Sequence, residues 1–265
     1  MGFETIEVSK EDGVATITLN RPERLNAWTH QMGGELQQAL NEGNEANDVG
    51  AFVVTGAGRG FCAGADVKDL FKAQADSGQV REGSSESGNW VDLVRRSKPI
   101  VAAVNGAAIG VGLTQILPMD FILAARGAKL SCRFIKMGLV PELASSHFLV
   151  ARCGLGLASE LMLSGKTVSA EEAQRIGLVD QVVESEQLLS EATEVARSMG
   201  ENPQVALQMV KELITQNMIE KDLTEVQRRE GKALSECYKS AEHREAIAAF
   251  LEKREPDFLK ARATD

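Results

Sequence analysis

The glycine residues of this chain are distributed very unevenly along its length. Of the 24 glycines, 22 precede residue 186, and only Gly200 and Gly231 follow it. Glycine serves at tight turns and is unfavourable inside helices, so the first part must contain many turns and the last part few. The distribution therefore predicts two regions of different architecture, residues 1–185 and residues 186–265.

The first region shows the pattern of an α/β fold. Residues 3–8 and 14–19 predict a hairpin whose turn contains Asp12 and Gly13. Short apolar runs typical of buried parallel strands occur at residues 51–55, 100–104 and 121–124. The segments between these runs are long enough for the crossover helices that parallel strands require.

The second region predicts amphipathic helices. Its apolar side chains recur at helical spacing. These positions are Ala206, Met209, Val210, Leu213, Leu223, Val226, Ala233, Leu234 and Cys237. Their apolar faces must be covered either by the α/β region or by another copy of the chain. We expect self-association, although the sequence alone leaves both possibilities open.

Composition excludes several classes of partner. With 38 acidic and 29 basic residues, a net charge of −9 and 5% aromatic residues, the chain does not suit nucleic acid. No apolar run of about 18 residues suggests a membrane span, and residues 1–10 lack a secretory signal pattern. Four scattered cysteines indicate a reducing compartment, so we expect a cytoplasmic protein. His30 and His243 lack ligand-like spacing, so no metal is expected.

Two glycine-rich turns are the first candidates for a functional site. Residues 55–66 follow a predicted strand and precede a helix that Asp66 is expected to cap, and residues 106–112 follow another strand. Neither turn matches the GxGxxG or GxxxxGK[ST] spacing of nucleotide-binding loops. A tight strand-to-helix turn without function is one interpretation. The other is that backbone amides from both turns converge on one developing oxyanion.

Several longer motifs resemble the crotonase superfamily, also called the enoyl-CoA hydratase/isomerase family. They are RGFCAGADVKDL (59–70), KPIVAAVNGAAIGVG (98–112), MGLVPELASS (137–146), SAEEAQRIGLVDQVV (169–183) and FLEKREPDF (250–258). Together they extend over nearly the whole chain. The resemblance implies a spiral of ββα units followed by a helical oligomerisation region, in a homotrimer or homohexamer. It also implies an acyl-CoA thioester as substrate, with coenzyme A as part of the substrate and no separate cofactor.

The resemblance also implies roles for individual residues. The backbone amides of Ala65 and Val111 match those that hold the thioester oxygen in the family. Positions matching Ala63, Asp66 and Val67 surround the adenine of coenzyme A. The candidate phosphate contacts are Arg24, Lys253 and Arg254, although a Lys or Arg taken alone is more often a solvated surface charge.

The acid–base residues decide which reaction is possible. The two glutamates of hydratases in this family align with Thr114 and Phe134, and neither side chain exchanges protons at neutral pH. Glu142, in the MGLVPE segment, resembles the catalytic base of the 3-enoyl-CoA to 2-enoyl-CoA isomerase branch. One carboxylate suffices there, since the proton taken from C2 can be returned to C4. The alternative is that Glu142 only caps a helix beginning near Ser145.

We therefore expect an enoyl-CoA isomerase with Glu142 as proton shuttle and the Ala65 and Val111 amides stabilising an enolate. Two alternatives remain, namely a hydratase or other crotonase-type enzyme, and an acyl-CoA-binding protein without catalysis. Trp90, Phe71 and Phe134 are candidates for lining an acyl pocket, with ordinary core packing as the alternative. Asp120 is expected to be a buried structural carboxylate, and residues 74–88 a surface loop.

Overall fold

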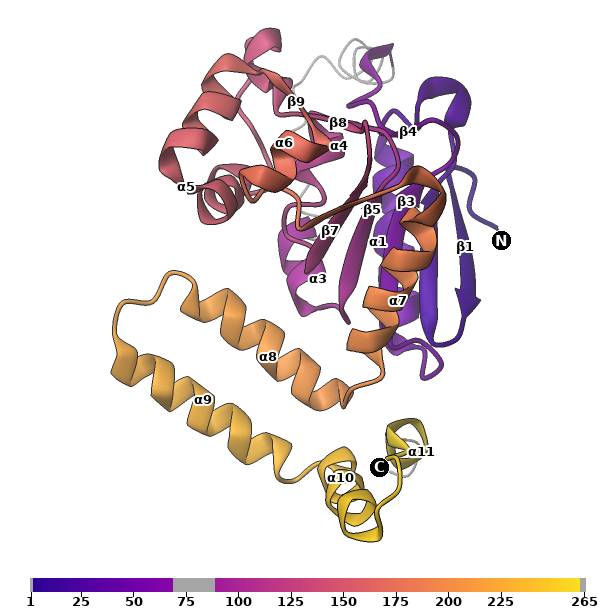
Figure 1. Cartoon of the computed structure of the whole chain (residues 1–265), viewed down its shortest axis with the longest axis vertical. Coiled ribbons are helices and arrows are strands. Elements are labelled where there is room, and N and C mark those ends of the chain that lie inside the picture. Colours follow the sequence, from indigo (N-terminus) through magenta and orange to yellow (C-terminus); the bar gives the residue numbers. More distant parts are fainter. Residues whose placement is uncertain (1, 69–88, 263–265) are drawn as a thin grey trace.

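The computed structural model of the chain describes residues 2–68 and 89–262. Within them, strands and helices form an α/β body, from which the C-terminal helices extend (Figure 1). The loop predicted at residues 74–88 and the side chain of Phe71 lie outside the described residues. In the described part of the chain, no helix is both long enough and apolar enough to cross a membrane.

A six-stranded sheet forms the centre of the body, in the order β1-β2-β3-β5-β7-β10. Its strands are β1 (Ile6–Glu11), β2 (Val14–Leu19), β3 (Ala51–Gly56), β5 (Ile100–Val104), β7 (Phe121–Ala125) and β10 (Gln181–Val183). Only β1 and β2 are antiparallel; all other neighbours in this sheet are parallel. The three apolar runs predicted as buried parallel strands are β3, β5 and β7, so that prediction is confirmed.

The turn of the hairpin sets the position of its first strand. Asp12 and Gly13 have φ angles of 46° and 78°, as a two-residue hairpin turn with two left-handed residues requires. Glu11 therefore pairs with Val14 and Ile6 with Leu19. The hairpin was predicted correctly, but its first strand lies at residues 6–11 instead of 3–8, because the turn fixes the register regardless of hydrophobicity.

A second, four-stranded sheet has the order β4-β6-β8-β9. Its strands are β4 (Gly60–Cys62), β6 (Ala107–Ile109), β8 (Lys129–Ser131) and β9 (Thr167–Ser169). From β3 to β8, successive strands alternate between the two sheets, so each pair of strands adds one strand to each layer. This alternation produces the expected spiral of ββα units.

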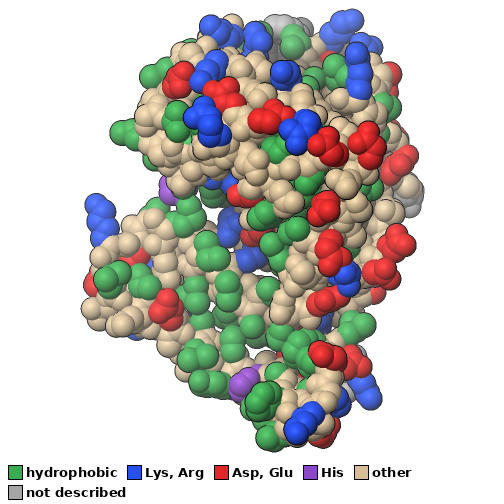
Figure 2. All heavy atoms as spheres, in the orientation of Figure 1, with side chains coloured by type: hydrophobic (Ala, Val, Ile, Leu, Met, Phe, Trp, Pro, Cys, Tyr) green, Lys and Arg blue, Asp and Glu red, His purple; other side chains and the backbone are tan. Residues whose placement is uncertain are grey.

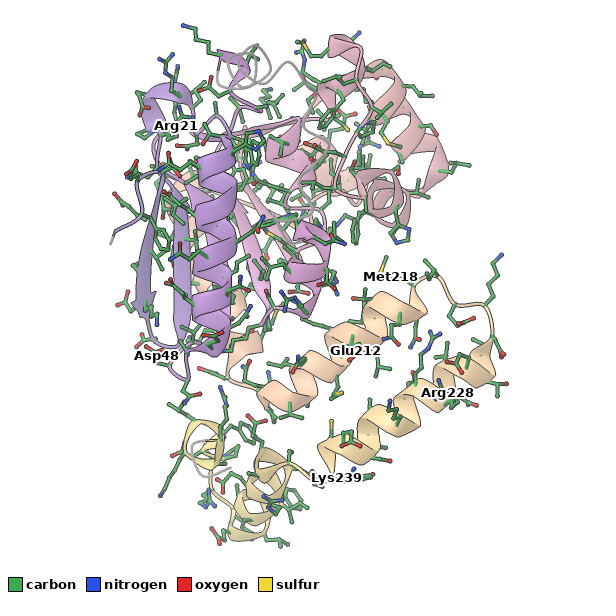
Figure 3. All side chains as sticks on the ribbon, turned by 180° about the vertical axis from the view of Figure 1, so that it is seen from behind. Arg21, Asp48, Glu212, Met218, Arg228 and Lys239 are labelled. Atoms are coloured by element: carbon green, nitrogen blue, oxygen red, sulfur yellow. The ribbon has the colours of Figure 1, made fainter. Side chains whose placement is uncertain are left out.

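Both faces of the central sheet are covered by helices. Helix α1 (His30–Glu45) lies on one face and α7 (Leu188–Gly200) on the other, as the two opposite views show (Figures 1 and 3). Along β3, Phe52 and Val54 belong to the apolar cluster under α1, whereas Val53 belongs to the cluster under α7. Although α7 lies in the predicted helical region, it packs against the α/β body.

The remaining helices of the second region extend away from the sheet (Figure 1). They are α8 (Gln204–Asn217), α9 (Leu223–Cys237), α10 (Ala241–Glu252) and α11 (Phe258–Arg262). Several of their large apolar side chains are exposed in the single chain. The other helical segments of the body are η1 (Pro22–Arg24), α3 (Trp90–Arg96), α4 (Val111–Thr114), η2 (Arg133–Met137), α5 (Ser145–Ser164), α6 (Ala170–Arg175) and η3 (Ser185–Gln187).

Candidate active site

The two glycine-rich turns lie side by side because they follow neighbouring parallel strands. Strand β4 pairs with β6, with Cys62 opposite Ala108. A Cβ on Gly112 would lie 2.1 Å from the Cys62 carbonyl oxygen, and one on Gly64 would lie 3.2 Å from the Ile109 oxygen. The two backbones are thus in direct contact, and Gly112 must be glycine for them to approach so closely.

Each turn presents one free backbone amide. Trp28 N–H donates to the Gly64 carbonyl and Asp66 N–H donates to the Trp28 carbonyl, both at 2.8 Å. Because the Gly64 carbonyl and the Asp66 N–H face Trp28, the Ala65 N–H between them is directed away from Trp28. Val111 is the first residue of α4, where N–H groups have no intrahelical acceptor. Neither N–H enters a backbone hydrogen bond within the described part of the chain. Both are therefore available to an oxygen atom of a ligand.

The residues expected around the adenine of coenzyme A lie beside this pair of turns. Ala63 N–H donates to the Leu25 carbonyl at 3.0 Å, which places the exposed Arg24 next to the first turn. Asp66 Oδ1 accepts from the Lys68 N–H at 3.2 Å, as the predicted helix cap requires. Val67 is 47% exposed and so accessible to a ligand. The structure therefore brings Arg24, Ala63, Asp66 and Val67 together.

Two residues that hold this arrangement were missed by the sequence analysis. Arg21, labelled in Figure 3, donates from Nη2 to Asp66 Oδ2 at 3.0 Å and from Nη1 to the Ala27 carbonyl. Asn26 is fully buried in a left-handed conformation, and its Nδ2 donates to the Ala57 and Gly60 carbonyls. Asparagine is one of the residues that favour turns, but nothing in the sequence identifies the partners of Asn26.

Glu142 lies between η2 and α5 and is exposed at the surface of the chain. Nevertheless, surrounding protein atoms remove enough water from its carboxyl group to raise its pKa. Its side chain makes no hydrogen bond with the described residues. A carboxyl group with a raised pKa, accessible and without a fixed partner, is suited to exchanging protons with a ligand.

The alternative role of Glu142 as a helix cap is wrong. The residue before α5 is Ala144, with φ of 53°, and no side chain caps this helix. Glu142 contributes only its carbonyl oxygen, which accepts from the Ser145 N–H at 3.0 Å.

The two positions that align with hydratase glutamates contain no acid. Thr114 is fully buried, and its hydroxyl has no hydrogen-bond partner among the residues that the structure describes. Phe134 is half-buried and packs against the main apolar cluster, as does Trp90, whose Nε1 donates to the Gln115 carbonyl at 2.9 Å. Both aromatic residues thus take part in core packing.

The single chain does not bring Lys253 and Arg254 to this site. They follow α10, at the opposite end of the molecule from β4 (Figure 1). Arg254 is also bound by the carboxylates of Glu245 and Glu252, which raise its pKa. Within one chain, these two residues therefore lie far from the glycine turns (Figure 1).

Comparison with known proteins gives a consistent result. Residues 9–261 match the family pattern described as Enoyl-CoA hydratase/isomerase. The chain is 38% identical over 262 residues to 1,2-epoxyphenylacetyl-CoA isomerase of Escherichia coli, covering 94% of this chain and 95% of that protein. It is 31% identical over 263 residues to short-chain-enoyl-CoA hydratase of Clostridium acetobutylicum, covering 99% and 100%. An enoyl-CoA hydratase structure from Polaromonas sp. JS666 superimposes with a TM-score of 0.87 at 32% identity, covering 95% and 98%.

Proposed function

Since the chain belongs to the enoyl-CoA hydratase/isomerase family of the crotonase superfamily, we propose that its reaction shifts the double bond of a 3-enoyl-CoA to the 2-position. The observation that supports this choice is the carboxyl group of Glu142. Glu142 has an accessible carboxyl group with a raised pKa, whereas Thr114 and Phe134 occupy the positions of the hydratase glutamates. One carboxylate is sufficient for isomerisation.

In the proposed mechanism, the Glu142 carboxylate removes a proton from C2 of the substrate. The electron pair of the C–H bond moves toward the thioester carbonyl and generates a dienolate, whose oxygen accepts hydrogen bonds from the Ala65 and Val111 N–H groups. The proton then passes from Glu142 to C4, and the double bond is left between C2 and C3. Each oxyanion donor contributes roughly 2.7–4 kcal/mol and the positioned base about 10²–10⁴-fold in rate.

Coenzyme A is proposed to lie along the first glycine turn. Its adenine contacts Ala63, Asp66 and Val67, and Arg24 meets a phosphate group. The ion pair between Arg21 and Asp66 supports this role, because it fixes the carboxylate beside the turn at 20% and 16% side-chain exposure. Lys253 and Arg254 are proposed to act on the coenzyme A of another copy in a trimer or hexamer assembled through the helices of residues 186–265.

Hydration is the second candidate, favoured by the names of several relatives. It requires a group that activates water as well as one that protonates carbon, whereas Thr114 and Phe134 occupy the positions that align with the two hydratase glutamates. A protein that binds acyl-CoA without turnover is the third possibility.

One experiment separates the three. The purified protein is incubated with a 3-enoyl-CoA and with a 2-enoyl-CoA while the absorbance of the conjugated thioester is followed. An isomerase raises the absorbance with the first substrate and a hydratase lowers it with the second. No change with either, together with binding measured by calorimetry, identifies a binding protein and contradicts the proposed reaction.

A further inference from the structure

A cavity of about 490 Å³ lies between α8, the first half of α5 and the amino ends of the central strands. Pro99, Asp120 and Asp180, which directly precede β5, β7 and β10, lie in its wall. The glycine turns of the candidate active site follow the carboxyl ends of β3 and β5. The cavity and the active site therefore lie at opposite ends of the central sheet.

Most of the wall is apolar. Its apolar side chains include Leu117, Met119, Phe148, Val210, Ile214 and Met218. Val210, Ile214 and Met218, the last labelled in Figure 3, are between 42% and 51% exposed, so the cavity is open along α8. Figure 2 shows basic side chains inside the recess between the body and α8–α9, surrounded by hydrophobic ones.

A cluster of charged side chains forms the inner end of the cavity. Asp120 accepts from Lys211 Nζ at 2.7 Å and from Arg95 Nη1 at 3.0 Å, and the side chains of Lys211 and Arg95 are only 7% and 11% exposed. Two nearly buried cations thus share one carboxylate. The cavity's other acid, Asp180, is already paired with Arg152 at 3.2 Å. The cluster has one positive charge in excess, which is costly away from water.

Arg95 has donors available for an additional anion. Its Nε donates to Thr215 Oγ1 and its Nη1 to Asp120 and to the Pro118 carbonyl, whereas its Nη2 has no acceptor among the described residues. Burial lowers the pKa of Lys211, and the charge of Arg95 adds to this effect. Lys211 Nζ donates to Asp120 and to the Val94 and Lys98 carbonyls, so its three donors are used. A second carboxylate bound to Nη2 of Arg95 would balance the charge.

We propose that this cavity binds an aliphatic carboxylate of the fatty-acid class, with its carboxylate on Nη2 of Arg95 and its chain along the apolar wall. A singly charged head group matches the single excess charge, whereas a phosphate would bring about two negative charges. The volume of the cavity lies within the range of about 300–1,000 Å³ that is usual for small-molecule sites.

The test is calorimetric titration of the full-length protein, in its natural assembly, with octanoate and with 1-octanol. We expect octanoate to bind at least tenfold more tightly than octanol, and to bind equally well when the protein is saturated with octanoyl-CoA. Equal binding of the two ligands, no binding of octanoate, or displacement of octanoate by octanoyl-CoA would overturn the proposal. None of these results bears on the isomerase reaction.

Variants distinguish a role in binding from a role in folding. Arg95→Gln should weaken octanoate binding at least tenfold, and Arg95→Lys should restore most of it. Arg96→Gln is the matched control, because the Arg96 side chain is 61% exposed and pairs with Asp92 on the surface. Val210→Trp keeps both cations but fills the cavity, so it should also abolish binding. Unchanged affinity in folded Arg95→Gln or Val210→Trp protein would contradict the assignment.

Discussion

Glu142 is the residue on which the proposed reaction depends most directly. Glu142→Gln keeps the shape of the side chain but removes its ability to accept a proton. We expect turnover of 3-enoyl-CoA to fall by about 10²–10⁴-fold while acyl-CoA affinity changes little. Deuterium should also cease to enter C2 of a saturated acyl-CoA in deuterated water. Glu186→Gln, at an exposed position in η3, is the control and should retain full turnover.

The raised pKa of Glu142 also predicts how the reaction depends on pH. The base acts as the carboxylate, so kcat/KM should rise with pH through a pKa above the ordinary value of 4.5. Because the folded state holds this proton more tightly than the unfolded chain, the free energy of unfolding should fall as pH rises through the same window. A pH–rate profile for the native protein checks the first effect. An acidic limb with an apparent pKa at or below 4.5 would contradict the conclusion that burial raises the pKa of the catalytic carboxyl group.

At the scale of single residues, the sequence predicts the glycine turns of the candidate site better than the residues that hold these turns in place. The glycine turns could be found because glycine marks a backbone requirement locally. Arg21 and Asn26 could not, because their partners Asp66 and Gly60 lie far along the chain. The contact exists only after β4 has folded beside the segment containing Arg21 and Asn26. Asp120, in contrast, was correctly predicted as a structural carboxylate, and it joins α3 to α8 through Arg95 and Lys211.

At the scale of elements, the contact between the two glycine turns is the feature that positions both amides. Gly112→Ala would place a Cβ 2.1 Å from the Cys62 carbonyl oxygen and 2.9 Å from the Cys62 Cβ, so β4 and β6 must separate. We expect loss of turnover together with a lower melting temperature. The measurements are the isomerase assay and thermal unfolding followed by circular dichroism.

Gly34→Ala is the matched control for that substitution. Gly34 lies inside α1, and a Cβ there would meet no atom within 4 Å. Alanine favours a helix by roughly 0.5–1 kcal/mol over glycine, so this variant should be more stable and fully active. Normal turnover in folded Gly112→Ala protein would show that the approach of the two turns does not position the amides.

Helices and strands could be predicted where the local sequence pattern determines them. They were harder to predict where strand register determines their bounds. The buried runs at β3, β5 and β7 were recognised because nearly every residue is apolar, as is typical of parallel strands covered on both faces. The polar end of β1, from Ser9 to Glu11, was missed because its pairing comes from the Asp12-Gly13 turn. Likewise, the helical spacing of α7 did not reveal that it covers the central sheet.

At the scale of the whole molecule, the position of the C-terminal helices cannot be predicted from the local sequence. Nothing between residues 241 and 262 indicates that α10 and α11 lie far from β4, since this depends on how α8 and α9 leave the body (Figure 1). The resemblance implies that Lys253 and Arg254 contact coenzyme A, whereas within one chain they lie at the opposite end of the molecule from β4 (Figure 1). A second copy of the chain is the natural way to reconcile the two observations.

The exposed apolar side chains of this region lead to a prediction about assembly. Phe250 is 83% exposed, Leu223 74% and Ile219 71%, which is unfavourable for helices that remain in water. We expect sedimentation equilibrium to give three or six times the chain mass of 28.5 kDa at micromolar concentration. Phe250→Asp should lower that mass without loss of helical circular dichroism, because the side chain makes little contact within its own chain. Val8→Asp, on the outer strand β1, should leave the mass unchanged. A stable monomer of the unmodified protein would contradict both the assembly and the proposed contacts of Lys253 and Arg254, while the Glu142 chemistry within each chain would still stand.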